Sequence, residues 1–129
     1  MNHLLMYNIP EKKAGTIRAI ALRHGFRTRV VGPEEFGYSV GVLAGLPETQ
    51  VQGDGAAFTD EMLVLCFVEG KAFHSFLAQL REKKVPVTLK AVLTEHNAQW
   101  TSSKLHESLV QEYEMLKNAG KTSTTNKEL

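Results

Sequence analysis

The stretch Met62-Leu63-Val64-Leu65-Cys66-Phe67-Val68 is an unbroken apolar run, with Glu69 and Gly70 directly after it. A strand with one face in water alternates apolar and polar residues, whereas a strand covered on both faces reads as a continuous apolar run. The run is too short for a membrane-spanning helix, which needs about 20 residues. We therefore expect it to be the buried central strand of an α/β domain.

Strand and helix patterns alternate along the rest of the chain. Residues 3–9 form a second apolar run that ends at Pro10, a residue that central strands exclude. Apolar residues recur at helical spacing within residues 11–24, and Gly25 follows where helices commonly end. Further patterns predict strands within 26–31 and 85–94, and helices over 33–46, 71–84 and from about 101 to 116.

This alternation predicts a four-stranded, mainly parallel sheet with right-handed crossovers and helices on both faces. The first and third strands are the most apolar, so we expect them to be neighbours in the middle, in the order 2-1-3-4. The alternative is a ferredoxin-like α+β fold with an antiparallel sheet, in which residues 32–61 are only a connection. A connection of that length with a helical pattern argues against this alternative but leaves it open.

Length and composition predict a single soluble domain. The chain has 129 residues, of which 43% are hydrophobic and 22% charged, as in ordinary globular proteins. We expect residues 1–116 to form the domain and the polar residues 117–129 to be a disordered tail. No internal repeat at solenoid spacing is evident. The formal net charge of +1 gives no general attraction to polyanions, so we expect no nucleic-acid or membrane partner.

Two features indicate the cytoplasm. The single cysteine excludes an internal disulfide and suits a reducing compartment. The first residues have no cationic segment, no long apolar segment and no small-residue cleavage site, so they do not resemble a signal peptide. We therefore expect a soluble cytoplasmic protein.

Three glycines at a spacing of four lie within the helical pattern of residues 33–46. Each costs about 1 kcal/mol relative to alanine inside a helix, so a close approach to another backbone should offset the cost. That backbone belongs either to the same domain or to a second copy in a symmetric homodimer. The candidate interface residues are Phe36, Gly37, Tyr38, Gly41 and Gly45.

Polar residues follow the predicted strands. In an open parallel sheet, ligands bind beyond the carboxyl ends of the strands. The candidate ligand-binding residues at those ends are Asn8, Glu69, Thr94, His96, Asn97 and Trp100. The plainer interpretation is that such residues are common in turns, with Asn97 bonded to its own backbone and Trp100 acting as a lid over the core.

The sequence lacks the motifs of several enzyme classes. It has no Walker A run, no Gly-x-Gly-x-x-Gly after the first strand, and no aspartate directly after the first or third strand as a phosphoryl-accepting receiver domain requires. Its five histidines show no metal-ligand spacing. We therefore expect no cofactor and no metal, and we interpret Cys66 as an inert packing residue.

Three hypotheses for function remain. The first is a non-enzymatic, homodimeric module that binds a small ligand or a protein partner at the edge of the sheet. The second is a small hydrolase or transferase in which Glu69 or Glu95 acts as general base with His96, which would require a shifted pKa in a cleft. The third is an assembly element that uses the glycine stripe.

The run Leu89-Lys90-Ala91-Val92-Leu93-Thr94, followed by Asn97 and Trp100-Thr101, resembles a family of small bacterial proteins classed as a domain of unknown function. The apolar strand at Met62 and the segment from Pro33 to Leu46 also resemble that family, so the resemblance spans roughly residues 4–116. It implies a single-domain, cytoplasmic bacterial protein. It implies no activity, cofactor or catalytic residue.

Overall fold

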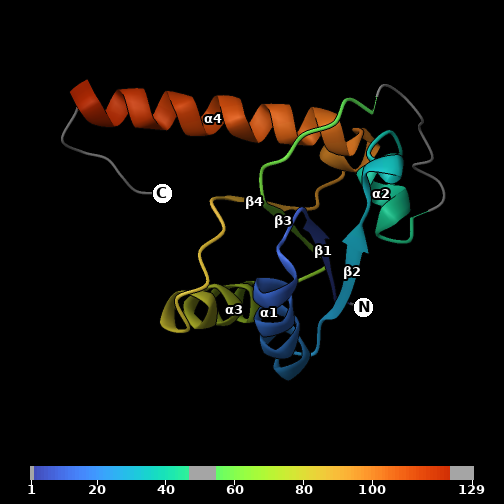
Figure 1. Ribbon diagram of the computed structural model, residues 1–129, viewed down its shortest axis with the longest axis vertical. Coiled ribbons are helices and arrows are strands. Elements are labelled where there is room, and N and C mark those ends of the chain that lie inside the picture. The colour runs from blue at the N-terminus through green and yellow to red at the C-terminus, as the bar shows by residue number, and fades with distance from the viewer. Residues whose placement is uncertain (1, 47–54, 123–129) are drawn as a thin grey trace.

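The computed structural model describes residues 2–46 and 55–122, and its centre is a four-stranded sheet in the order β2-β1-β3-β4 (Figure 1). The strands are His3–Tyr7 (β1), Arg27–Val31 (β2), Met62–Cys66 (β3) and Leu89–Val92 (β4). The predicted strand order is confirmed, and every residue of β3 is buried, as expected of a central strand. The predicted mainly parallel sheet is wrong, because β1 and β3 run antiparallel between two parallel pairs.

The described part of the connection between β2 and β3 agrees with the mixed sheet. This connection contains a 3-10 helix, η1 (Pro33–Glu35), and a short helix, α2 (Val40–Leu43). A helix of four residues spans about 6 Å, much less than the roughly 17 Å of a five-residue strand. The chain enters β3 at the edge of the sheet where β2 ended, since Tyr7 pairs with both Val31 and Met62. The ferredoxin-like alternative is also wrong, because each β-α-β unit pairs its own two strands.

The predicted glycine stripe does not form, because no single helix spans residues 33–46. Gly37 lies between η1 and α2, Gly41 lies within α2, and Gly45 follows α2 with φ of +100°. A close backbone approach does occur, since a Cβ built on Gly55 would lie 2.8 Å from the Gly37 backbone nitrogen. Phe36 is completely buried and cannot form an intermolecular contact. Of the candidate interface side chains, Tyr38 remains exposed.

The sheet consists of two β-α-β halves with matching geometry. The first half contains β1, α1 (Glu11–Arg23) and β2, and the second contains β3, α3 (Gly70–Glu82) and β4. Asn8 and Gly25 have positive φ in the first half, and Phe67 and Lys84 have positive φ in the second. The two residues of each half are separated by the same interval along the chain. An approximate two-fold axis therefore relates the halves.

The same axis relates the segments that follow each half. The first half leads into η1 and α2, and the second leads into another 3-10 helix, η3 (Asn97–Gln99), and then α4 (Ser102–Thr122). Ser39, directly before α2, pairs with Thr101, directly before α4, in an isolated antiparallel bridge. The structure therefore contains a repeat that the sequence did not reveal.

Helices cover both faces of the sheet, as predicted, with α1 and α3 on one side and α2 and α4 on the other (Figure 1). The core under α1 and α3 takes equivalent residues from both halves. These counterparts are Leu4 and Leu63, Met6 and Leu65, Ile17 and Phe76, Ala21 and Leu80, and Phe26 and Val85. The second core lies under α2 and α4 and includes Phe36, Leu43 and Leu105.

Helix α4 is longer than predicted. It continues to Thr122, past the boundary at residue 116 that was expected to begin a disordered tail, and residues 123–129 lie outside the described part of the chain. Its C-terminal end runs beyond the strands (Figure 1). None of the helices in residues 2–46 and 55–122 is both long and apolar enough to cross a membrane.

Candidate functional site

The predicted site residues lie at two opposite edges of the sheet. Because β1 and β3 are antiparallel, the carboxyl end of β1 adjoins the start of β3, with Tyr7 paired to Met62. Asn8 therefore lies at one edge. Glu69 and residues 94–100 follow β3 and β4 at the other edge. The expected convergence of all these residues at one edge is wrong, since it required a parallel sheet.

Asn8 has a structural role in the turn after β1. Its φ is +59°, a left-handed conformation that asparagine tolerates better than most residues. Its side-chain amide nitrogen donates hydrogen bonds of 3.0 Å to the carbonyl oxygens of Phe58 and Asp60. Asn8 therefore fastens the segment that precedes β3 to the end of β1.

Thr94 and Asn97 fix each other in the turn after β4. The Thr94 backbone N–H donates to Asn97 Oδ1 at 2.9 Å, and the Asn97 backbone N–H donates to Thr94 Oγ1 at 3.0 Å. Asn97 Nδ2 also donates to the carbonyl oxygen of Val92 at 3.0 Å. These bonds use both Oδ1 and Nδ2 of Asn97 within the turn, so Asn97 holds the loop in place.

Trp100 lies over the second core and is partly buried. The ring of His96 meets it edge-on at 5.1 Å between centroids, and Lys104 Nζ lies 4.9 Å from the centre of its ring. Trp100 therefore has the position of a lid, with aromatic and cationic neighbours.

The contacts of His96 bear on the enzymatic hypothesis. A general base that acts with a histidine needs to lie within hydrogen-bond reach of it. Within the described residues, no hydrogen bond or ion pair joins His96 to Glu69 or Glu95. The same residues contain no group of three or more histidine, cysteine or carboxylate side chains that could hold a metal ion.

A pocket of about 500 Å³ lies at the carboxyl ends of β3 and β4. Thr94 and Glu95, from the predicted edge, line it together with Leu46, Leu93, Ala98 and Gln99. Its remaining lining residue is Phe67, which directly follows β3. We call this the β3–β4 pocket.

Phe67 combines backbone strain with exposure. Its φ is +63°, a conformation that is uncommon for a bulky side chain. Its side chain is 40% exposed, and its ring meets that of His3 edge-on at 6.1 Å between centroids. The sequence did not indicate Phe67, because a phenylalanine within an apolar run reads as part of the buried strand.

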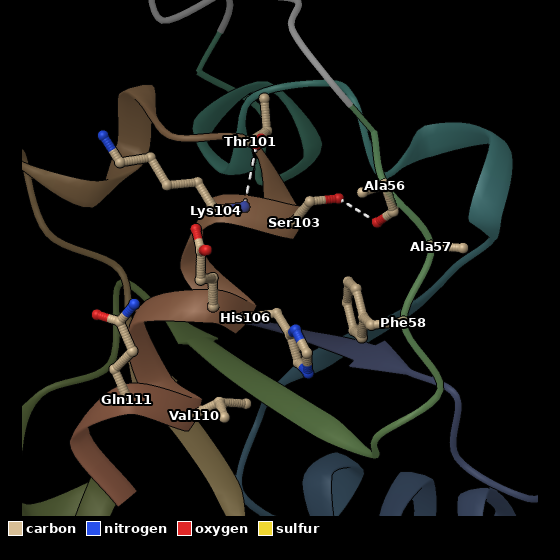
Figure 2. Close-up of a pocket in the computed structure, with 10 residues that line it drawn as sticks. Ala56, Ala57, Phe58, Thr101, Ser103, Lys104, His106, Val110 and Gln111 are labelled. Carbon is tan, nitrogen blue, oxygen red and sulfur yellow. Dashed lines mark hydrogen bonds between the residues drawn. The ribbon is translucent and has the colours of Figure 1, made fainter. Parts of the chain in front are cut away.

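A larger cavity of about 630 Å³ lies between residues 56–58 and the first turns of α4 (Figure 2). Figure 2 shows the ring of His106 beside that of Phe58, and the two rings are stacked with centroids 4.0 Å apart. His106 Nε2 also lies 2.8 Å from Asp60 Oδ2.

Ser103 also lines this cavity, but its hydroxyl group is bonded away from His106. Ser103 Oγ donates to the carbonyl oxygen of Ala56 at 2.6 Å, as the dashed line in Figure 2 shows. The contacts of Ser103, His106 and Asp60 therefore hold the segment before β3 against α4. They do not include the hydrogen bond between a nucleophile and its base that nucleophilic catalysis needs.

Cys66 is completely buried at the end of β3, and burial raises the pKa of its thiol to about 12. A reactive cysteine needs a lowered pKa and access to solvent. This environment agrees with the expected packing role.

Comparison with known proteins gives one match. Residues 61–116 match a family described as Domain of unknown function (DUF3783), and no curated protein or solved structure matches the chain. The resemblance to a domain of unknown function is thus confirmed over that part of the chain. The matched region contains the second half of the fold, η3 and most of α4, and all residues of the β3–β4 pocket except Leu46.

Proposed function

We propose that this protein is a non-catalytic binding module whose binding site is the β3–β4 pocket. The observation that carries the proposal is Phe67, a strained and exposed aromatic residue that lines a pocket at the strand ends. A backbone conformation of this kind costs roughly 1–3 kcal/mol and persists at sites where it serves a function. In the equivalent turn after β1, Asn8 adopts the same conformation at lower cost, and its amide nitrogen donates hydrogen bonds to two carbonyl oxygens.

The lining of the pocket indicates what it binds. Phe67, Leu46, Leu93 and Ala98 supply apolar surface, and Glu95 supplies one carboxylate. Pockets of this size with mostly apolar walls and a few polar groups are typical of small-molecule and side-chain binding sites. The proposed ligand is therefore an aromatic group with a hydrogen-bond donor, carried by a small molecule or by a partner protein.

Indole is a suitable probe, because it offers an aromatic face and one N–H donor. The proposal predicts that indole shifts the backbone amide signals of Phe67, Leu93 and Ala98 in an NMR titration. The variant Phe67→Asn keeps the left-handed turn but removes the ring, so indole binding should weaken at least tenfold.

Leu22→Asn is the matched control, since Leu22 is an exposed apolar residue on α1 at 74% exposure and lies outside the pocket. It should leave indole binding unchanged. Equal loss in both variants, or undiminished binding to Phe67→Asn, would remove the β3–β4 pocket as the binding site.

We also propose that the module is a homodimer in the cytoplasm, with the contact on the C-terminal part of α4. The apolar stripe of α4 continues from Leu105 and Leu109 to Tyr113 and Leu116. The first two pack on the second core, whereas Tyr113 is 44% and Leu116 is 59% exposed. A second copy that packs its own α4 against this surface would cover both side chains symmetrically.

Native mass spectrometry and light scattering over a concentration series test the dimer. Leu116→Glu should shift the protein to monomer, whereas Met115→Glu should not, because Met115 is exposed but points about 100° around the helix from Leu116, outside the apolar stripe. A wild-type protein that stays monomeric at high concentration would exclude this proposal.

A further inference from the structure

A second pocket, of about 550 Å³, lies at the opposite end of the second half, where α3 ends and the chain turns into β4. Its walls are apolar and include Leu77, Leu80 and Pro86. Its remaining side chains include three cations, Arg81, Lys84 and Lys90. We call it the α3–β4 pocket.

The α3–β4 pocket exists because the halves differ in the turn before their last strand. In the first half, β2 begins at Arg27, just after the left-handed Gly25. In the second half, β4 begins only at Leu89, well after the left-handed Lys84. The additional residues, which include Pro86 and Thr88, form one wall of the pocket against α3.

The three cations of the pocket have no acidic partner within the described residues, since the ion pairs there join other side chains. Lys90 Nζ donates to the carbonyl oxygen of Val87, which holds the ammonium group at the pocket wall. Glu82, the neighbouring carboxylate on α3, accepts a hydrogen bond from Gln79 Nε2 at 2.7 Å. The positive charge of the pocket is therefore not neutralised from within the described chain.

Lys90 lies where its charged form is disfavoured. Burial, and in second place the nearby Arg81, lower the pKa of its ammonium group. A negative group in the pocket would relieve this repulsion, because an opposite charge close to an ammonium favours its charged form.

We propose that the α3–β4 pocket binds a small organic carboxylate with an apolar body, such as a medium-chain fatty acid. The apolar walls contact the hydrocarbon, and Arg81 and Lys90 contact the carboxylate. Guanidinium and ammonium groups form charge-assisted hydrogen bonds with carboxylates, which are stronger than bonds between neutral groups. This site is separate from the β3–β4 pocket and does not depend on the function proposed for that pocket.

Four soluble probes, tested on the unmodified protein, distinguish recognition of the negative charge from recognition of the apolar body. Octanoate has both the charge and the apolar body, octanol has only the body, acetate has only the charge, and octylamine has the opposite charge. In NMR titrations, octanoate should bind at least tenfold more tightly than each of the other three, with the largest amide shifts at Leu80, Val85 and Lys90. Equal binding of octanoate and octylamine, or octanoate shifts centred elsewhere, would overturn the proposal.

Substitutions at the cations test the assignment by residue. The double variant Arg81→Gln with Lys90→Gln should weaken octanoate binding at least tenfold and leave octanol binding within twofold. Lys71→Gln removes a cation at the other end of α3 and should leave octanoate binding unchanged. Octanoate binding that is the same in the double variant and in wild type would contradict the proposal.

Discussion

The turn after β1 and the turn after β3 have the same backbone conformation but carry different side chains. Asn8 closes the first turn with two hydrogen bonds to the segment before β3. Phe67 holds the same conformation in the second turn without such bonds among those described, and its ring faces a pocket. The same left-handed backbone conformation is thus stabilised by hydrogen bonds in the first half and remains strained in the second.

The two halves also differ in how their ends are covered. The carboxyl end of β1 is covered by residues 56–60, which Ser103 and His106 fasten to α4. The carboxyl ends of β3 and β4 leave the β3–β4 pocket, and the longer turn before β4 forms the α3–β4 pocket. We therefore propose structural roles for the ends of the first half and binding roles for the ends of the second.

The largest effect should come from the shared core. Ile17 and Phe76 are counterparts in one continuous cluster, so Ile17→Ala and Phe76→Ala should each lower the free energy of unfolding by about 3–4 kcal/mol. Chemical denaturation followed by circular dichroism measures this loss. If each variant unfolded only its own half, in two separate transitions, the halves would not share one core.

The next largest effect should come from the turn after β1. Asn8→Ala removes two hydrogen bonds and places a less tolerant residue at positive φ, so it should cost about 2 kcal/mol. Asn8→Gly keeps the conformation and should cost about half as much. A negligible loss of unfolding free energy in Asn8→Ala would show that the Asn8 side chain does not stabilise this turn.

Tyr7 and Cys66 make a matched pair for pH dependence, since they end β1 and β3 and are both fully buried. Burial raises the pKa of Cys66 to about 12 and also raises that of Tyr7, although the Ser102 hydroxyl, 2.7 Å from the Tyr7 hydroxyl, opposes this shift. The folded protein therefore keeps both protons at pH values where the unfolded chain releases them. The free energy of unfolding should fall as pH rises.

The fall should begin near pH 9 and reach about 1.4 kcal/mol per pH unit for each group. Cys66→Ala should remove the stage that begins near pH 9, and Tyr7→Phe the stage that begins near pH 10. Urea denaturation at a series of pH values distinguishes these stages. Identical slopes in wild type and in both variants would show that neither buried group controls the alkaline limit.

The smallest effect on stability should come from Phe67. In Phe67→Asn the relief of backbone strain opposes the loss of apolar contact, so the free energy of unfolding should change by less than about 1 kcal/mol. Thermal and chemical denaturation of the variant measure the balance. A loss of 3 kcal/mol or more would mean that Phe67 is a core residue with no strain to relieve.

The sequence predicted the features of this fold that depend on local patterns. The apolar run at residues 62–68 predicted the buried β3, because a strand covered on both faces needs apolar residues. Gly25 predicted the end of α1, because glycine is common where helices end. The direction of β3 could not be predicted, since an apolar run has the same pattern in parallel and antiparallel sheets. The wrong prediction of a parallel sheet came from the predicted helix over residues 33–46, which the structure shows to be interrupted.

The position of some candidate site residues could be predicted for the same reason. Thr94 and Glu95 were expected at a strand end, and both line the β3–β4 pocket. Asn8 was assigned to the wrong edge, since that assignment depended on strand direction. Phe67 could not be found at all, because nothing in an apolar run marks the residue at which the backbone becomes left-handed. The repeat was also hidden, since its counterparts share apolar character but few identities.

The most direct test of the two roles is an NMR titration with indole that compares the two left-handed turns in the same protein. We expect amide shifts at Phe67 and its neighbours in the β3–β4 pocket, and none at Asn8. Shifts of equal size at both turns, or shifts at Asn8 alone, would contradict the assignment of structure to the first half and binding to the second.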